Sequence, residues 1–271
     1  MQGLDFHTHS EYEIFLFHGG NCRFLVGNQI YYLHPGDLLM MDGMTVHRAY
    51  VFGNEENYER SVIHFDAKWI EPLLADLQID DLLKFFTENR NGLIRTFEKE
   101  DLVSIENMFL AMKKLDALDS SYKNEAKRKL ALVQILLKID SATVRVMDKA
   151  QNYEDERTKI AEEISSYVFE HYRESFTIED VASTLNLSKS YLSHVFKEIT
   201  GYTIMHYVMG YRLSQARYAL LNDHSKSIKV IAFEHGFESD AHFSRFFKQN
   251  VGMTPSQYRK NNQYTNGKGA F

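Results

Sequence analysis

The sequence predicts an α+β protein of two domains, in which a small antiparallel β-barrel or sandwich precedes an all-α domain. Three observations support this prediction. Residues 6–65 contain short apolar segments between turn signals, residues 69–147 change to a helical period, and the C-terminal part contains an internal repeat. With 271 residues, the chain is long enough to bury two cores of ordinary size.

The β-rich part consists of segments that favour strands because they are rich in β-branched and aromatic residues. These segments read EIFLF, RFLV, QIYYL, DLLMM and RSVIHF. Turn signals separate them, namely GGN at 19–21, GN at 27–28, PG at 35–36 and DG at 42–43. Closely spaced strands with such turns predict a small antiparallel barrel or sandwich.

The segment that follows has a helical spacing of apolar residues in its second half. The residues at intervals of four and three are Tyr122, Ala126, Leu130, Val133 and Leu137. This apolar stripe must be buried. It can pack on the β-domain, or it can pair with its counterpart in a second subunit.

A polar segment, DKAQNYEDER at residues 148–157, separates the two predicted domains because it lacks apolar periodicity. We therefore place the first domain at residues 1–150 and the second at residues 158–260. Charge differs between the two parts: residues 1–156 carry 17 Lys and Arg against 26 Asp and Glu, whereas residues 157–271 carry 14 against 11. A mildly basic second part is compatible with contact to nucleic acid.

The second domain contains a duplication of one helical unit. The segment that begins at Thr177 matches the segment that begins at Ser227 at an offset of 50, and from Leu192 onward the offset is 51. Each copy reads as a helix, a short turn and a second helix closed by glycine, with turns LNLS at 185–188 and HGFES at 235–239. Such helix-turn-helix units can place their second helix in the major groove of DNA.

Helical spacing assigns a buried and an outward face to the second helix of each copy. The predicted buried residues are Leu192, Val195, Phe196 and Ile199 in the first copy, and Phe243, Phe246 and Phe247 in the second. The outward residues, our candidates for DNA binding, are Ser190, Ser193, His194, Lys197, Ala241, Ser244, Arg245 and Lys248. Short side chains permit close approach to base edges, Arg245 can make two hydrogen bonds to guanine, and the lysines can reach phosphates.

A connecting helix is expected between the two copies, over residues 203–221. Its 19 residues span about 28 Å, which is close to the roughly 34 Å helical repeat of B-DNA. Two recognition helices can therefore occupy successive major grooves on one face of the duplex.

Residues 158–260 resemble the DNA-binding domain of AraC/XylS-type transcription regulators. The resemblance rests on IEDVASTLNLSKSYLSHVFKEITG, on the connecting YRLSQARYALL, and on IKVIAFEHGFESDAHFSRFFKQNVGMTPSQYR. It implies a transcription regulator, more often an activator, whose partners are double-stranded promoter DNA and RNA polymerase. It also implies a homodimer that forms through residues 121–147.

The N-terminal stretch HTHSEYEIFLFHGG, residues 7–20, places two histidines and a glutamate at alternate strand positions. His7, His9 and Glu13 then point to one side of an extended strand, a geometry that can hold a metal ion. This stretch and LHPGDLLMMDGMTVH resemble the two motifs of the cupin barrels that sugar-sensing members of the same family carry. The resemblance puts His7, His9 and Glu13 at ligand positions of the first motif and His47 at the histidine of the second.

The predicted function is sequence-specific DNA binding controlled by a small effector, a sugar or a related metabolite, that is held in the cupin-like barrel. Besides the four motif residues, Arg23, Arg60 and His64 either orient such a ligand with their polar tips or are exposed on the other face of the barrel. For the motif residues, effector contact, a divalent metal and a purely structural role are all open, and no other cofactor and no catalytic residue is expected. The competing hypothesis is a metal-dependent cupin enzyme fused to a DNA-binding domain.

Composition narrows the class of protein further. Hydrophobic residues make up 44% and charged residues 25%, as in soluble globular proteins. The chain does not open with a basic stretch and an apolar run, and no segment approaches the roughly 18 apolar residues of a membrane helix. We therefore expect a cytoplasmic protein without a membrane partner. The single Cys22 cannot form an internal disulfide and is expected to be a packing residue.

Overall fold

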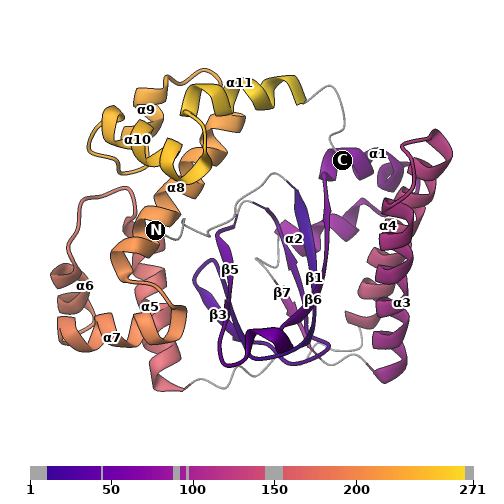
Figure 1. Cartoon of the computed structure of the whole chain (residues 1–271), viewed down its shortest axis with the longest axis horizontal. Coiled ribbons are helices and arrows are strands. Elements are labelled where there is room, and N and C mark those ends of the chain that lie inside the picture. Colours follow the sequence, from indigo (N-terminus) through magenta and orange to yellow (C-terminus); the bar gives the residue numbers. More distant parts are fainter. Residues whose placement is uncertain (1–10, 44, 88–91, 96–97, 144–154, 266–271) are drawn as a thin grey trace.

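The computed structural model describes residues 11–43, 45–87, 92–95, 98–143 and 155–265, and its β-rich part forms two antiparallel sheets (Figure 1). One sheet has four strands in the order β6-β1-β4-β7, and the other has three in the order β3-β2-β5. The strands are β1 (Tyr12–Gly19), β2 (Cys22–Val26), β3 (Gln29–Tyr32), β4 (Leu38–Met41), β5 (His47–Val51), β6 (Glu59–Phe65) and β7 (Gly92–Ile94). Each predicted β segment forms a strand, except for Leu33 and Asp37 at the segment ends, whereas β5 and β7 were not predicted.

The two sheets face each other as an open sandwich, one of the two predicted arrangements, and the described strands do not close into the cupin-like barrel that the resemblance implies. No described strand of one sheet makes a ladder with the other sheet. Alternate residues of β1 point into the layer between the sheets, where the rings of Phe15 and Phe24 lie 4.8 Å apart. The buried side chains of this layer are Phe15, Phe17, Cys22, Phe24, Val26, Leu33, Leu39 and Met41. Burial raises the pKa of the Cys22 thiol to about 12, which suits a packing residue.

Helices cover the outer face of the four-stranded sheet. They are α1 (Ala67–Asp76), α2 (Lys84–Thr87), α3 (Lys99–Asp116) and α4 (Tyr122–Thr143), with short 3-10 turns at Glu55–Asn57 and Asp80–Leu83. Ile14 and Leu16 of β1 share one core with Ile105 of α3 and Ile135 of α4. The β1 sequence is a nearly continuous apolar run because both faces of this strand are buried.

Helix α4 packs on the β-domain with one face and leaves another face open to solvent. Val133 belongs to the predicted apolar stripe and is buried, as are its neighbours Leu132, Leu136 and Ile139. Three other members of the stripe, Tyr122, Leu130 and Leu137, are 92%, 54% and 41% exposed. The stripe is therefore divided between the core and an apolar surface of the molecule.

The C-terminal part contains the two helix-turn-helix units that the repeat predicts. Its helices are α5 (Glu156–His171), α6 (Ile178–Thr184), α7 (Lys189–Thr200), α8 (Ile204–Asn222), α9 (Ile228–Glu234), α10 (Asp240–Val251) and α11 (Pro255–Thr265). Helices α6 and α7 form the first unit together with α5, and α9 and α10 form the second together with α11. Of the described helices, none combines the length and the apolar composition that a bilayer crossing requires.

The outer face of the three-stranded sheet packs on the first helix-turn-helix unit (Figure 1). Leu25, Ile30 and Val46 lie in one buried core with residues of α5, α7 and α8. The second unit has a core of its own, formed by α8, α9 and α10. Helices α3 and α4 and the first unit thus lie on opposite sides of the two sheets, and the second unit lies beside the first, at the top of the view in Figure 1. The exact extents of the two domains remain a prediction, since most of residues 148–157 lie outside the described part.

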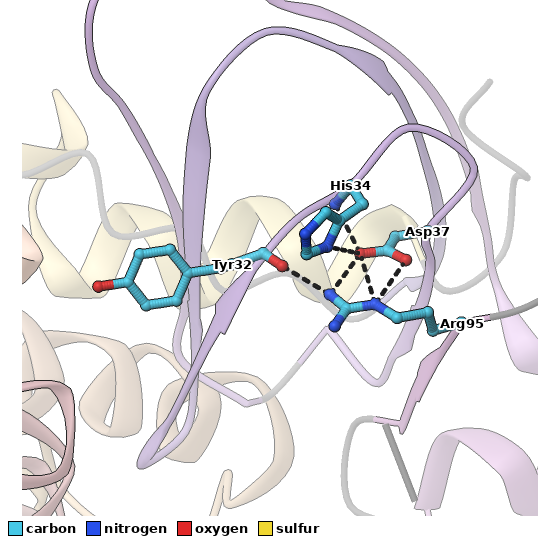
Figure 2. A network of polar contacts seen from close by, with 4 residues as sticks. All are labelled: Tyr32, His34, Asp37 and Arg95. Atoms are coloured by element: carbon cyan, nitrogen blue, oxygen red, sulfur yellow. Dashed lines mark hydrogen bonds and ion pairs between the residues drawn. The ribbon is translucent and has the colours of Figure 1, made fainter. Parts of the chain in front are cut away.

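A buried ion pair ties the two sheets together at one end (Figure 2). Arg95, which follows β7, donates hydrogen bonds to both carboxylate oxygens of Asp37 at 3.0 and 2.8 Å. Its Nη2 also donates to the carbonyl of Tyr32 at 2.6 Å. Asp37 precedes β4, is only 2% exposed, and accepts a further bond from the backbone amide of His34 at 2.7 Å. One guanidinium therefore joins the end of β3 to the beginning of β4 and to β7.

Candidate nucleic-acid interface and effector site

Helix α7 has the two faces that its spacing predicts. Its buried residues include all four predicted ones, Leu192, Val195, Phe196 and Ile199. This burial leaves Ser190, His194 and Lys197 exposed and Ser193 partly exposed. The helix begins after Ser188, whose hydroxyl accepts a hydrogen bond from the backbone amide of Tyr191. It ends at Gly201, which has a left-handed φ of 78°.

A carboxylate lies beside the basic end of this face. Arg157 of α5 donates to both oxygens of Glu198, at 2.8 and 2.6 Å. Nε2 of His194, one turn earlier on α7, lies 3.4 Å from the same carboxylate. Arg157 neutralises the carboxylate of Glu198. The positive charge of Lys197 on the neighbouring position can therefore interact with a negatively charged ligand of this face.

Helix α10 repeats the construction of α7 in the second unit. Both helices have 12 residues, a serine at the N-cap and a left-handed glycine at the C-cap. Phe243 and Phe247 are fully buried as predicted, whereas Phe246 is only partly buried. Ala241, Arg245 and Lys248 are exposed and Ser244 is partly exposed.

The outward residues of the two helices can serve the same chemistry. Ser193 corresponds to Ser244, and Lys197 corresponds to Lys248, one turn further along each helix. Small and hydroxyl-bearing side chains allow a helix to approach base edges, while lysines reach phosphates. In the structure, Arg245 Nε donates to the carbonyl of Ala241 at 3.4 Å, so its guanidinium lies along the exposed helix surface.

A second polar cluster, in the β-rich part, consists of Glu13, His47 and His64. Glu13 and His64 are direct neighbours in the ladder of β1 and β6. Oε2 of Glu13 lies 3.1 Å from Nε2 of His64 and 3.3 Å from Nε2 of His47. Glu13 and His47 are buried, at 5% and 4% exposure, whereas the His64 side chain is 46% exposed. Glu13 and His47 are thus closed off from solvent, whereas the ring of His64 is accessible to it.

Hydrogen bonds fix the orientation of this Glu13–His47–His64 cluster. Nδ1 of His47 donates to the carbonyl of Thr45 at 2.8 Å, which holds the ring in place. The hydrogen bond that His64 donates to Glu13 raises the pKa of His64, although burial acts in the opposite direction. A carboxylate with two oriented imidazoles can bind the hydroxyl groups of a polar ligand.

The described residues do not form a metal site. No group of three or more potential ligands in the described part has a suitable arrangement. The Nε2 atoms of His47 and His64, which would bind a cation, both point at one oxygen of Glu13 instead. His7 and His9, which the sequence assigns to the same site, lie outside the described residues.

Two of the predicted effector ligands, Arg23 and Arg60, lie away from the cluster. Nη1 of Arg23 donates to the carbonyl oxygens of Glu198 and Ile199, at 2.6 and 2.9 Å, on the outer side of the three-stranded sheet. It thus places a cation at the C-terminal end of α7, where the helix dipole favours one. Arg60 lies four residues from His64 along β6, about 13 Å at about 3.3 Å per residue, with its guanidinium over the ring of Tyr58.

Sequence reasoning missed the polar contacts between the sandwich and the first unit. Tyr32 bonds Thr158 at 3.0 Å, and the Ile30 amide donates to Glu162 at 2.8 Å. Two more bonds run from Asn28 to Ser166 at 2.9 Å and from the Tyr207 hydroxyl to the carbonyl of Gly27 at 3.0 Å. The partners are 126 to 180 residues apart in the chain, so no local pattern could have revealed them.

Comparison with known proteins agrees with these two parts. Residues 1–112 match the model of the AraC-like ligand binding domain, and residues 181–261 match the model of a helix-turn-helix domain. The melibiose operon regulatory protein of Escherichia coli strain K12 is 38% identical over 97 residues, which are 36% of this chain and 32% of that protein. The matching part thus spans about a third of the length of that relative.

Two further matches differ in extent. The uncharacterized HTH-type transcriptional regulator YdeC of Bacillus subtilis strain 168 is 24% identical over 272 residues, 96% of this chain and 87% of that protein. Among solved structures, the C-terminal domain of AraT, a response regulator from Geobacillus stearothermophilus, is 32% identical. It covers 38% of this chain and 84% of that chain, with a TM-score of 0.36.

The first prediction concerns the charge of His64. Glu13→Gln should lower the pKa of His64, because a neutral amide no longer favours the imidazolium. An NMR titration of the His64 ring proton, assigned with His64→Gln, measures the change. A pKa that is the same in both proteins would contradict the geometry.

The same pKa shift has a consequence for stability. Because the folded-state pKa of His64 is raised, its stabilising contribution is complete below the unfolded value of about 6.5 and is lost as pH rises through the folded value. The free energy of unfolding should therefore fall more steeply in the native protein than in Glu13→Gln as pH rises from about 6.5 through the folded pKa of His64.

Proposed function

The chain belongs to the AraC/XylS family of DNA-binding transcription regulators, and from this premise we propose that it activates promoters in response to a small polar effector. One observation carries the DNA-binding part of this proposal. Two recognition helices of equal length and equal capping, α7 and α10, expose the same sequence of small, hydroxyl-bearing and basic side chains. Double-stranded promoter DNA is then the main partner, and RNA polymerase is the partner that activation requires.

The two recognition helices divide base reading from phosphate binding in this proposal. Arg245 is the residue for a bidentate contact to guanine, since its guanidinium is exposed midway along α10. Lys197 and Lys248, nearer to the helix ends, contact phosphates, which carry little sequence information. Ser190, Ser193, His194, Ala241 and Ser244 permit the close approach of the helices to the groove.

The chemistry of the Glu13–His47–His64 cluster favours a neutral, hydroxyl-rich effector such as a sugar. The carboxylate of Glu13 and the nearby carboxylate of Glu11 would repel an anion, and both already act on the charge of His64. Carboxylate and imidazole groups accept and donate hydrogen bonds to hydroxyls, which suits a polyol. His7 and His9 complete this site in our proposal.

The strand β5 offers a short path from the effector site to the DNA-binding part. His47 points into the sandwich, whereas the next residue, Arg48, points outward and places its guanidinium 3.9 Å from the ring centre of Tyr202. Tyr50 reaches the glycine that closes α7, because a Cβ on Gly201 would lie 2.5 Å from the Tyr50 ring. A movement of β5 on effector binding would therefore reach the end of the first recognition helix.

We also propose that the exposed apolar face of α4 binds a second copy of the chain. Leu130 and Leu137 are two turns apart, and Leu110 of the neighbouring α3 is 57% exposed. Solvent-exposed leucines at such spacing on two adjacent helices suit an isologous contact, in which the same patch meets itself across a two-fold axis.

The second prediction separates base reading from phosphate binding. Arg245→Ala should relax preference at one base pair at a cost of about 1 to 3 kcal/mol. Lys197→Ala should weaken binding to all DNA sequences about equally and reduce the salt dependence of the affinity. Titrations with cognate and scrambled duplexes at several salt concentrations measure both effects. Equal loss of affinity for both duplexes in Arg245→Ala would refute its assigned role.

The third prediction tests the effector site. A panel of neutral sugars should contain a ligand that raises the melting temperature of the protein, since a ligand bound only by the folded state stabilises it. His47→Ala should abolish this shift and leave DNA affinity unchanged. His18→Ala is the matched control, because His18 lies on β1 but bonds Ser61 rather than Glu13. Turnover of the ligand with a stoichiometric bound metal would instead favour a cupin enzyme.

The fourth prediction concerns assembly. Replacing Leu130 and Leu137 together by Asp should give monomers that keep a folded C-terminal part, because the contact would bury unpaired charges. Analytical ultracentrifugation measures the mass of the particle in solution. The control is Leu77→Asp, which changes a leucine that is 49% exposed but lies outside the α4 face, and this variant should remain dimeric. A double variant that sediments as a dimer would move the contact to another surface.

A further inference from the structure

The connecting helix α8 passes from one core into another. Tyr207, Val208 and Tyr211 are buried in the core of the first unit, whereas Leu213 and Ala216 are buried in the core of the second. The residue at the crossing is Arg212, which is only 9% exposed. A buried arginine at the junction of two units requires partners, and those partners show what it holds together.

Arg212 binds the end of the first unit. Its Nε donates to the carbonyl of Tyr172 at 2.7 Å, and its Nη2 donates to the carbonyl of Glu174 at 2.6 Å. Both carbonyls follow directly after α5, the helix that packs against α7. The guanidinium therefore ties the C-terminal end of α5 to the middle of α8 with two charge-assisted bonds.

The turn of the second unit packs against the same hydrogen bond. Gly236, between α9 and α10, has a φ of 79°, and a Cβ there would lie 2.4 Å from the Tyr172 oxygen and 2.7 Å from Arg212 Nε. Beside it, the ring of His235 stacks on the ring of Tyr172, with centroids 6.2 Å apart and planes 10° apart. Three elements, the end of α5, α8 and the α9–α10 turn, thus meet at Arg212.

Comparison of the two repeat copies shows whether the turn itself or the contact with Arg212 requires glycine at position 236. The residue of the first copy that corresponds to Gly236 is Asn186, which also has a positive φ, of 52°. Asparagine tolerates the left-handed conformation, so the turn itself does not require glycine. Glycine is required in the second copy because the Tyr172–Arg212 bond leaves no room for a side chain.

We propose that Arg212 is a positioning residue that fixes the separation and rotation of α7 relative to α10, and so determines which spacing of DNA half-sites the chain accepts. A change of one base pair between half-sites moves one of them by about 3.4 Å and turns it by about 35° around the duplex axis. A rigid pair of units cannot follow this change, whereas a pair joined only by α8 and its loops can adapt in part. This inference rests on the DNA-binding function proposed above.

The test compares half-site spacings. Selection from random duplexes with the full-length chain gives the preferred site, from which duplexes with one base pair added or removed between the half-sites are made. The native protein should prefer the selected spacing by about tenfold or more, since both units must bind at once. In Arg212→Met this preference should fall to about twofold, with affinity for an isolated half-site unchanged within about twofold.

A matched control lies on the same helix. Arg217 of α8 contacts Tyr258 of α11, and both residues belong to the second unit. Arg217→Met removes a guanidinium from α8 without touching the first unit, so its spacing preference should equal that of the native protein. Arg212→Lys keeps a cation with less fixed geometry and should give an intermediate preference, which provides a second variant if Arg212→Met fails to fold.

The possible outcomes are distinct. A native protein that selects no sequence would overturn the proposed function. A native protein that selects a site, with variants of Arg212 that lose affinity equally for all spacings, would show that Arg212 only stabilises the domain and would overturn this inference alone.

Discussion

Burial of both faces of the three-stranded sheet is the constraint on which the rest of the structure depends. The inner face meets the four-stranded sheet, and the outer face presents Leu25, Ile30 and Val46 to the first helix-turn-helix unit. A fully buried aliphatic side chain contributes roughly 1.5 to 3 kcal/mol, more than the roughly 0.5 to 1.5 kcal/mol of each hydrogen bond across the same boundary. Apolar contact therefore dominates the attachment, and the polar contacts determine its orientation. The outer face of the three-stranded sheet is in this way part of the core of the first helix-turn-helix unit.

Helices α6 to α10 could be predicted from the sequence, whereas α5 and α11 were not predicted. Each recognition helix is defined by local signals, a serine cap, apolar residues at helical spacing and a closing glycine, and the repeat supplies every signal twice. Phe246 is the exception, since it is only partly buried. The β-rich half was predicted less well. Its strands have local signals, but whether a sheet closes depends on pairing between distant strands, and β5 and β7 lack the apolar runs that mark the others.

The candidate effector site shows the same limit at the level of single residues. The side of a strand on which a residue lies follows from alternation only when one face is apolar and the other polar. In β2, RFLV is apolar on both faces, so the sequence could not decide that Arg23 points to α7 rather than into the sandwich. Glu13 and His47 lie together as their motifs indicated, and His64 joins them because β1 and β6 are neighbours.

The passage of α8 through two cores also bears on how the molecule opens. Its first half, up to Tyr211, is secured by the sandwich and the first unit, and its second half by the smaller core of the second unit. Local unfolding of the second unit would expose the C-terminal half of α8 to solvent, while the N-terminal half stays buried in the first unit. Backbone amides of a single continuous helix should then exchange with solvent at two rates, with the step between them at the residue where the cores meet.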